Sequence, residues 1–428
     1  MSLICRKYLR YAVLVAVVVV IYFQCLWNDF LFQWDDQWVV VNVFTDMGFT
    51  SDNLWNILTQ FYHGQYAPMN ELYYVLIYSL FGYNSYAFHA GSVILHVGNV
   101  LLVYKCISLL LVKICKPHID TYRIAFITAL LFAVHPVCVE SVAWLSASKI
   151  LVYSFFYLLA IYMYLRYIEN QTVISYILVL LFFVFSFGGK EQAVVLVLCC
   201  ILIDYVTQRD VSVYQLILEK VPLLLLAVFF GIITIMSQGN TGSGNMPQYD
   251  FVERCLLACY SLFEYIVKAV IPYNLSYIYP FPFQPGDDIP LSVYLCPAYL
   301  LAMVYLVYVF RKDKIIVFAA FFFLIHVLVT LHIIPISRFA VTADRYEYLS
   351  LIGIMLLVAY LFTINSHTVK WIRWIMIIYI IYLSFITFTY QKKWKNSETL
   401  KYDMREILKS RDDLQDENKI LILDLKTK

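Results

Sequence analysis

The chain has 428 residues, of which 62% are hydrophobic and 14% are charged, and its formal net charge at pH 7 is +2. Soluble domains carry about a quarter charged residues, so this composition indicates an integral membrane protein. The small net charge provides no basic field of the kind that attracts nucleic acid, and we expect no nucleic-acid partner. The ten cysteines lack the paired spacing of a disulfide or zinc framework.

Long apolar runs recur along the chain, and each is close to the ~20 residues that cross a hydrocarbon core as a helix. The first run, Tyr11–Phe23, follows Arg6, Lys7 and Arg10 as in a signal peptide, but bulky residues stand where signal peptidase requires small ones. We therefore predict an uncleaved first span. The sequence predicts an all-α membrane protein with about eleven transmembrane helices, near residues 10–27, 88–104, 124–137, 148–166, 173–188, 192–207, 213–236, 291–310, 315–334, 348–364 and 370–389.

The segment 28–88 contains no Lys or Arg, whereas basic residues cluster before the first span and in alternate loops. Cytoplasmic loops are enriched in Lys and Arg, so we predict a cytoplasmic N-terminus and a long extracytoplasmic loop at 28–88. Within this loop, Asn53–Tyr62 and Glu71–Leu80 have apolar faces but are too short to span. This pattern favours short interfacial helices that lie along the outer membrane surface.

The apolar segment 255–272 is long enough to span, but counting it would place the basic loop at Arg311 outside the cytoplasm. Glu264 and Lys268 lie four residues apart and can pair on one face of a helix. We therefore predict that this segment is a helix lying in the outer interface.

This topology divides the chain into a polytopic membrane domain at 1–390 and a short polar extracytoplasmic tail at 391–428. The tail is rich in Lys, Asp and Glu, and residues 398–417 are expected to form a short polar helix.

Two adjacent carboxylates, Asp35 and Asp36, follow the first span on the predicted outer side. A general base must lie where a substrate hydroxyl can approach it. Neighbouring residues project in different directions, so we expect one of the two to do this chemistry. The alternative is a turn or a helix N-cap, both of which favour Asp.

A second polar motif lies where the third predicted span reaches the outer side. Pro136 interrupts the helix, so His135 and Glu140 stand at a break where backbone groups need partners. The alternative for His135 is that it only satisfies this break. The spacing of His135 and Glu140 is poor for a metal site, and the sequence indicates no metal or other cofactor.

Cations and tyrosines stand at two further outer ends of the predicted spans. Lys190, followed by Glu191, is a point charge suited to a phosphate, or else a lysine that reaches along the interface and pairs with its neighbour. Arg345, with Tyr346 and Tyr348, suits a phosphate and a stacking surface, although an interfacial aromatic belt also accounts for the tyrosines. An acid, cations and aromatics on one membrane face suit an anionic lipid-linked sugar.

These motifs resemble, in order and over nearly the whole chain to about residue 400, the GT-C glycosyltransferases. They resemble in particular the protein O-mannosyltransferase-like proteins whose relatives carry tetratricopeptide repeats. The landmarks are Trp34-Asp35-Asp36, Tyr66-Ala67-Pro68-Met69-Asn70, His96-Val97-Gly98-Asn99, His135-Pro136-Val137, Lys190-Glu191, Pro272-Tyr273-Asn274-Leu275-Ser276, Asp344-Arg345-Tyr346-Glu347-Tyr348 and Trp394-Lys395-Asn396-Ser397-Glu398.

The resemblance implies an inverting transfer of a mannose-like sugar from a polyprenyl-phosphate donor to an acceptor hydroxyl of a protein (Ser or Thr) or a glycan. It implies a base at Asp35 or Asp36, and contact with the donor phosphate at Arg345 and Lys190, with Lys149 as a further candidate. Supporting positions in the same motifs are His135, Glu140, Glu191, Tyr346 and Tyr348.

Two features depart from the family pattern. Family members often carry an arginine before the proline of the loop motif, where this chain has Ala67. The repeats are also absent, so we expect a partner protein to replace them in acceptor recognition. The expected location is a bacterial inner membrane, or the endoplasmic reticulum membrane in a eukaryote, with the site on the extracytoplasmic side.

Two other classes of function remain open at this point. A transporter or flippase of lipid-linked sugars would use membrane charges as a path, but it should show internal repeats and broken helices near the midplane. The sequence has no convincing repeat, and its charged residues lie at the predicted outer rim. A non-catalytic membrane scaffold is the second alternative, and the departure at Ala67 keeps it open.

Overall fold

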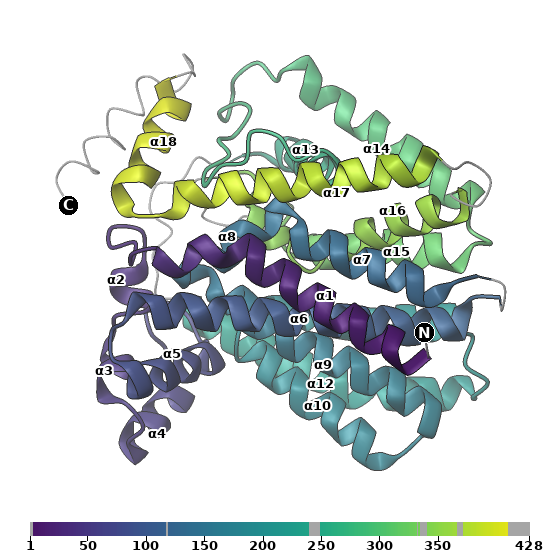
Figure 1. Cartoon of the computed structure of the whole chain (residues 1–428), viewed down its shortest axis with the longest axis horizontal. Helices are drawn as coiled ribbons and strands as arrows, with labels where there is room; N and C mark the ends of the chain where they lie inside the picture. The colour runs from purple at the N-terminus through teal and green to yellow at the C-terminus, as the bar shows by residue number, and fades with distance from the viewer. Residues whose placement is uncertain are drawn as a thin grey trace.

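The computed structural model describes residues 3–116, 119–238, 249–331, 333, 340–365 and 371–409. All regular elements in these residues are helices, apart from two isolated bridges, Tyr62 with Gln65 and Tyr279 with Thr342. The long helices lie side by side along one direction, and a group of short helices covers one end of them (Figure 1). The fold is therefore an all-helical bundle with a distinct end layer.

The bundle is made of helices rich in branched apolar residues. A helix satisfies its backbone hydrogen bonds within itself and so needs no water. The bundle helices are α1 (Leu3–Tyr22), α6 (Ser85–Ile114), α7 (Thr121–Val134), α9 (Ser148–Asn170), α10 (Val173–Phe187), α11 (Leu196–Thr207), α12 (Val213–Gln238), α13 (Phe251–Val270), α14 (Leu291–Val309), α15 (Lys314–Leu328), α16 (Leu351–Asn365) and α17 (Trp371–Tyr390). Each predicted span contains one of them, and α13 is the apolar segment that we predicted to lie in the interface.

The chain is a multi-pass membrane protein, but its helices differ in length. Among the described residues, six helical segments are long and apolar enough to cross a membrane, and a seventh is if α7 continues through a 53° bend into the next helix. Helices α10, α15 and α16 are apolar but shorter. Fifteen helical residues rise only about 22 Å, less than a typical hydrocarbon core of ~30 Å. The number of eleven spans therefore stays a prediction.

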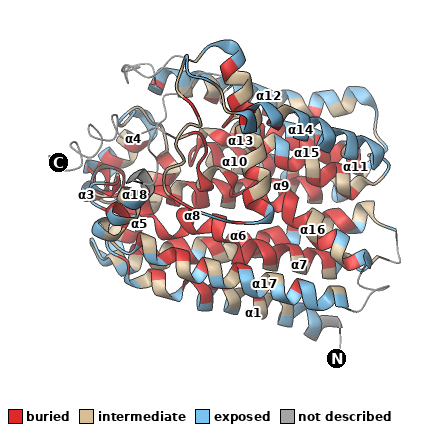
Figure 2. Cartoon of the chain, turned by 90° about the horizontal axis from the view of Figure 1, so that it is seen from above, coloured by how far each residue is buried: buried red, intermediate tan, exposed pale blue. Residues whose placement is uncertain are grey.

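The centre of the bundle is formed by α6, α7, α9, α15 and α16. Along an apolar stretch of 18 residues in each helix, 61% of the residues of α6 and 72% of those of α9 are buried, against 11% in α14 and 17% in α17. Figure 2 shows the same division, with buried residues on the central helices and exposed ones on α12, α14 and α17. Gly353 lets α15 and α16 approach closely, since a side chain at this position would collide with the Ala319 carbonyl.

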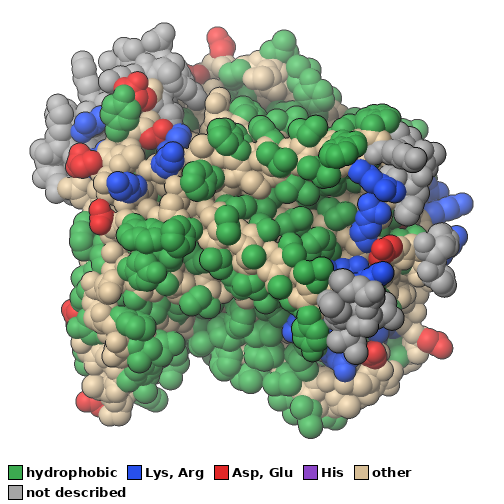
Figure 3. Space-filling view, viewed as in Figure 1, with side chains coloured by type: hydrophobic (Ala, Val, Ile, Leu, Met, Phe, Trp, Pro, Cys, Tyr) green, Lys and Arg blue, Asp and Glu red, His purple; other side chains and the backbone are tan. Residues whose placement is uncertain are grey.

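The outer surface of the bundle is apolar between its two ends. Figure 3 shows a broad hydrophobic surface across the middle of the molecule, with Lys and Arg side chains at the end that carries the N-terminus and a second group of them, mixed with acidic side chains, at the opposite end. Apolar side chains on α12, α14 and α17 are exposed in large numbers, for example Leu225, Leu301 and Ile378. Such a belt is expected where helices face lipid rather than water.

The segment 28–88 forms the end layer, with the short helices α2 (Asp36–Val39), α3 (Val43–Met47), α4 (Ser51–Thr59) and α5 (Pro68–Phe81). The short helices predicted in this segment are present as α4 and α5, and each begins a few residues early. Thr50 caps α4 by accepting a hydrogen bond from the backbone of Asn53, and Pro68 opens α5 at a position where a missing N–H costs nothing. Their place at a membrane interface stays a prediction.

Two further sequence predictions concern α13 and the tail. The pair on α13 is confirmed, because Lys268 Nζ lies 3.6 Å from Glu264 Oε2. The polar helix predicted at 398–417 begins as α18 (Ser397–Lys409), and residues 410–417 lie outside the described part of the chain. The first part of the tail is not a free polar segment, since Leu400 and Met404 are buried in the main core.

Candidate active site

The end layer is tied to the bundle through Asp36, which opens α2 and is fully buried. Its carboxylate accepts hydrogen bonds from the backbone N–H groups of Leu31 (2.7 Å) and Ser146 (3.0 Å), and from the Ser146 hydroxyl. Burial raises the pKa of Asp36 to about 6, although these donors lower it. Asp36 therefore joins two segments that are more than a hundred residues apart, and its oxygens are occupied by protein donors.

Asp35 has a different environment from its neighbour. Its side chain is partly exposed, and one oxygen accepts a hydrogen bond from Trp38 Nε1 at 3.1 Å. The backbone has φ of 77°, in the left-handed region that non-glycine residues adopt at some cost. Residues held in such conformations are concentrated at functional sites. The turn therefore presents Asp35 outward and turns Asp36 inward.

Arg345 and Glu140 form an ion pair between two helical segments. Glu140 is fully buried on α8 (Val139–Ala143), and Arg345 lies on the short helix η5 (Asp344–Glu347). The Arg345 backbone N–H donates to Glu140 Oε2 at 2.7 Å, and its guanidinium pairs with Oε1. The guanidinium also lies 5.4 Å from the ring of Trp144 and 4.8 Å from that of Tyr346. Glu140 thus fixes Arg345, whose side chain is 21% exposed.

Lys190 lies beside Arg345, in the link between α10 and α11. Its Nζ stands 4.6 Å from the ring centre of Tyr346, and the residue is only 6% exposed. Gly189 lets this link pack on α9, because a Cβ there would lie 2.8 Å from the backbone nitrogen of Tyr153. Burial lowers the pKa of Lys190 to about 8, while Tyr346 and Glu191 oppose that shift.

Lys149, in the first turn of α9, connects these cations to the end layer. Its Nζ donates to Gln65 Oε1 at 3.0 Å, and it interacts electrostatically with Glu191, Arg345 and Asp35. Five separate segments of the chain thus meet at one place. We call Asp35, Glu140, Lys149, Lys190, Glu191 and Arg345 the charged cluster.

A group of aromatic side chains that the sequence predictions missed lies next to the charged cluster. Tyr277, in the link between α13 and α14, packs edge-on against Trp34 at 5.0 Å, Trp144 at 5.3 Å and Trp394 at 5.8 Å between ring centres. It interacts electrostatically with Arg345, and burial raises its pKa. The signal was present in part, because Tyr277 directly follows the motif that ends at Ser276.

Of the predicted supporting residues outside the charged cluster, Tyr346 lies against Arg345 and Lys190, whereas His135 and Tyr348 belong to the bundle. His135 is fully buried, with Nε2 3.0 Å from the Ala269 carbonyl and with Nδ1 accepting from the backbone of Val137. His135 bonds backbone groups at and near the helix break at Pro136, which agrees with the alternative given for it in the sequence analysis. Tyr348 is also fully buried, and its hydroxyl lies 2.7 Å from His96 Nδ1. Tyr348 is therefore a bundle residue, because the helical turn that exposes Tyr346 directs it inward.

Comparison with known proteins gives the charged cluster a context. No family model matches the chain. The chain is similar to protein O-mannosyltransferases. It is 26% identical over 234 residues to a protein O-mannosyl-transferase of Caenorhabditis elegans, which covers 53% of this chain and 32% of that protein.

Two mammalian relatives extend the comparison. The chain is 31% identical over 150 residues to the protein O-mannosyl-transferase TMTC1 of Homo sapiens, and 36% identical over 109 residues to that of Mus musculus. These matches cover 32% and 25% of this chain, and 16% and 11% of the relatives. The matched region is thus about a third or less of the length of these proteins. The similarity supports a glycosyltransferase-like relationship.

The charged cluster can bind an anionic group next to a carboxylate. Arg345, Lys149 and Lys190 provide positive charge for an anionic group, and Asp35 is a partly exposed carboxylate within the same field. Among the described residues, no group of three or more His, Cys, Asp or Glu side chains is placed to hold a metal ion. Arg and Lys side chains bind phosphate groups in many protein sites.

Proposed function

We propose that this protein is a membrane glycosyltransferase that moves a mannose-like sugar from a polyprenyl-phosphate carrier to a Ser or Thr hydroxyl of an acceptor protein. The observation that carries the proposal is the meeting of Asp35 with Arg345, Lys149 and Lys190. A carboxylate that can accept a proton, surrounded by cations, fits a reaction in which a hydroxyl loses a proton while an anionic phosphate leaves. The likeness to O-mannosyltransferases supports the same reaction class.

In this mechanism the acceptor oxygen attacks the anomeric carbon from the side opposite the phosphate. A new carbon–oxygen bond forms as the bond to the phosphate oxygen breaks, and that oxygen keeps the electron pair. The proton of the acceptor hydroxyl passes to Asp35. A single displacement of this kind inverts the configuration at the anomeric carbon.

Asp35 is assigned as the base in preference to Asp36. A base must come within hydrogen-bond reach of the hydroxyl, and Asp35 is partly exposed with one protein donor on its carboxylate. Asp36 is buried and accepts from Leu31 and Ser146. We assign Asp36 to holding the end layer against the bundle.

The three cations have different parts in holding the donor phosphate. Arg345 presents a planar guanidinium that can form two parallel bonds to phosphate oxygens, whereas Lys190 and Lys149 act as point charges. Glu140 is a positioning residue, since it holds Arg345 through both backbone and side chain. Tyr346 lies between Arg345 and Lys190 and can stack on the sugar.

The proposal includes the topology and the wider architecture. Eleven helices, all those of the bundle except α13, would cross the membrane in a GT-C-like arrangement with the N-terminus in the cytoplasm. The charged cluster would then lie on the extracytoplasmic side of a bacterial inner membrane or of the endoplasmic reticulum. Residues 391–428 would lie on that side too, where a partner protein can bring the acceptor.

The test is transfer by the purified protein in lipid nanodiscs, with a radiolabelled polyprenyl-phosphate mannose and a set of Ser- and Thr-containing peptides. Label is expected to appear on the peptide, and it should be lost in the Asp35→Asn variant. If the protein instead moves the lipid-linked sugar across vesicles without transferring it, the transporter alternative replaces this proposal. If it does neither, the scaffold alternative does.

A further inference from the structure

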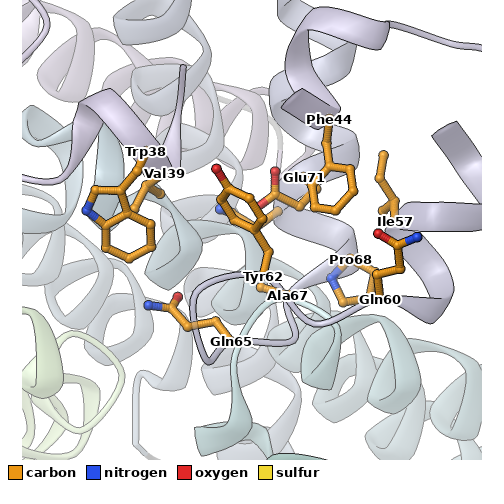
Figure 4. Close-up of a pocket in the computed structure, with 11 residues that line it drawn as sticks. Trp38, Val39, Phe44, Ile57, Gln60, Tyr62, Gln65, Ala67, Pro68 and Glu71 are labelled. Carbon is orange, nitrogen blue, oxygen red and sulfur yellow. The ribbon is translucent and has the colours of Figure 1, made fainter. Parts of the chain in front are cut away.

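A pocket in the end layer lies outside the proposed reaction and holds polar groups that the mechanism does not use. It is enclosed by α2, α3, α4, α5 and the turn at residues 60–67 (Figure 4). Trp38, Phe44 and Tyr62 form aromatic walls, and Glu71 stands among them. The pocket thus combines aromatic faces with a carboxylate.

Glu71 has no cationic side chain in contact with it in the described residues. Its Oε2 accepts one hydrogen bond, from Asn42 Nδ2 at 3.0 Å, and Lys149 acts on it only electrostatically. The segment 28–88 contributes no Lys or Arg that could pair with it. Burial raises the pKa of Glu71 to about 7. The carboxylate is therefore poorly compensated by the protein.

The neighbouring Asn70 belongs to the pocket wall, and its side chain is hydrogen-bonded to Tyr74. The residue is only 1% exposed. Glu71 is therefore the polar group of the pocket that an occupant can meet. Its carboxylate accepts hydrogen bonds, which favours an occupant that donates them.

The pocket is directly linked to the charged cluster through two of its lining residues. Trp38 Nε1 donates to Asp35, the proposed base, at 3.1 Å, and Gln65 accepts from Lys149 at 3.0 Å. A chain that brings a hydroxyl to Asp35 can therefore place a neighbouring side chain in the pocket. The position suits the acceptor rather than the lipid-linked donor, because the pocket is built from the end layer alone.

We propose that this pocket binds a basic side chain, Lys or Arg, of the acceptor polypeptide close to the Ser or Thr that receives the sugar; this inference rests on the proposed function. An ammonium or guanidinium group donates hydrogen bonds and accepts none, which suits the Glu71 carboxylate. Its charge pairs with the carboxylate, and its stem and charge pack on the faces of Trp38 and Tyr62. An acidic side chain is excluded by repulsion from Glu71.

The test compares peptides that differ only at the basic position. Fluorescent peptides carry one Thr, with a Lys placed one to four residues to either side, and each has a partner in which norleucine replaces the Lys. Dissociation constants are measured by anisotropy with the full chain in nanodiscs, and initial transfer rates are measured in parallel. The variants are Glu71→Gln, which removes the charge but keeps an acceptor for Asn42, and Asp52→Asn, a matched charge loss at an exposed site on α4.

At the favoured position, norleucine is expected to weaken binding about tenfold in the parent protein and in Asp52→Asn, the usual size of one charge-assisted contact. In Glu71→Gln the two peptides should bind within about twofold of each other. Equal binding of every pair to the parent, or a preference that survives in Glu71→Gln, overturns the pocket assignment even if transfer occurs. A Glu71-dependent preference without transfer to any peptide keeps the pocket and removes the proposed function.

Discussion

The neighbouring carboxylates Asp35 and Asp36 should respond in opposite ways to the same isosteric change. In Asp35→Asn the side chain keeps its shape and can still accept from Trp38, so the folded protein should lose little stability. Transfer should fall by about 10²–10⁴-fold, the usual contribution of a general base. In Asp36→Asn the main effect should be on stability.

The size of the Asp36 effect follows from its contacts. The two carboxylate oxygens accept from donors on opposite sides, Leu31 on one oxygen and Ser146 on the other. Asparagine offers one acceptor and one NH₂ group, so at least one buried N–H loses its partner. An unsatisfied buried donor costs about 1–3 kcal/mol, and relief from burying a charge offsets part of that. A loss of about 1–2 kcal/mol is therefore expected for Asp36→Asn.

Both quantities are measurable on the purified variants in one detergent. Thermal stability is followed as the fraction of monodisperse protein after heating, and transfer is followed as the initial rate at saturating donor. Asp35→Asn should unfold at the parental temperature with a rate near background, and Asp36→Asn should unfold several degrees lower with a substantial residual rate. The assignment is refuted if Asp35→Asn keeps its rate, or if Asp36→Asn abolishes transfer at unchanged stability.

Three further changes test the donor site and the topology. Arg345→Ala should raise the KM for the donor about 10–100-fold, because a forked charge-assisted contact is lost. The control Arg311→Ala, at an exposed position beyond α14, should leave KM unchanged. Equal effects of the two changes would remove Arg345 from the donor site. Lys190 is protonated below its pKa of about 8 and neutral above it, so donor affinity should weaken as pH rises from 7 to 9. Lys190→Arg stays charged and should flatten this dependence. If the variant shows the same dependence of donor affinity on pH as the parent, the role of Lys190 is contradicted. A thiol introduced by Asp46→Cys, at an exposed site of α3, should react with an impermeant reagent only from the extracytoplasmic side, and labelling from the cytoplasm alone would reverse the proposed topology.

Much of the architecture could be predicted from the sequence because it depends on local physical chemistry. A run of apolar residues must satisfy its backbone within a helix in lipid, so each predicted span contains a helix of the bundle. The short helices α4 and α5 were likewise readable from their amphipathic pattern, and the pair of Glu264 with Lys268 from its spacing. Lys190 and Arg345 were singled out as candidates because polar groups at membrane depth are costly and often mark a site.

Other features depended on contacts between distant parts of the chain. Which of Asp35 and Asp36 is buried is decided by Ser146, 110 residues beyond Asp36 in the chain, and no local spacing encodes that contact. Tyr277 joins the site only because three tryptophans from separate segments pack around its ring. The sequence by itself thus determined a helical membrane protein with charged ends, since burial of apolar runs is local. The tertiary structure decided which of those charged groups are buried and bonded and which are left to meet a substrate, because that depends on packing between segments far apart in the chain.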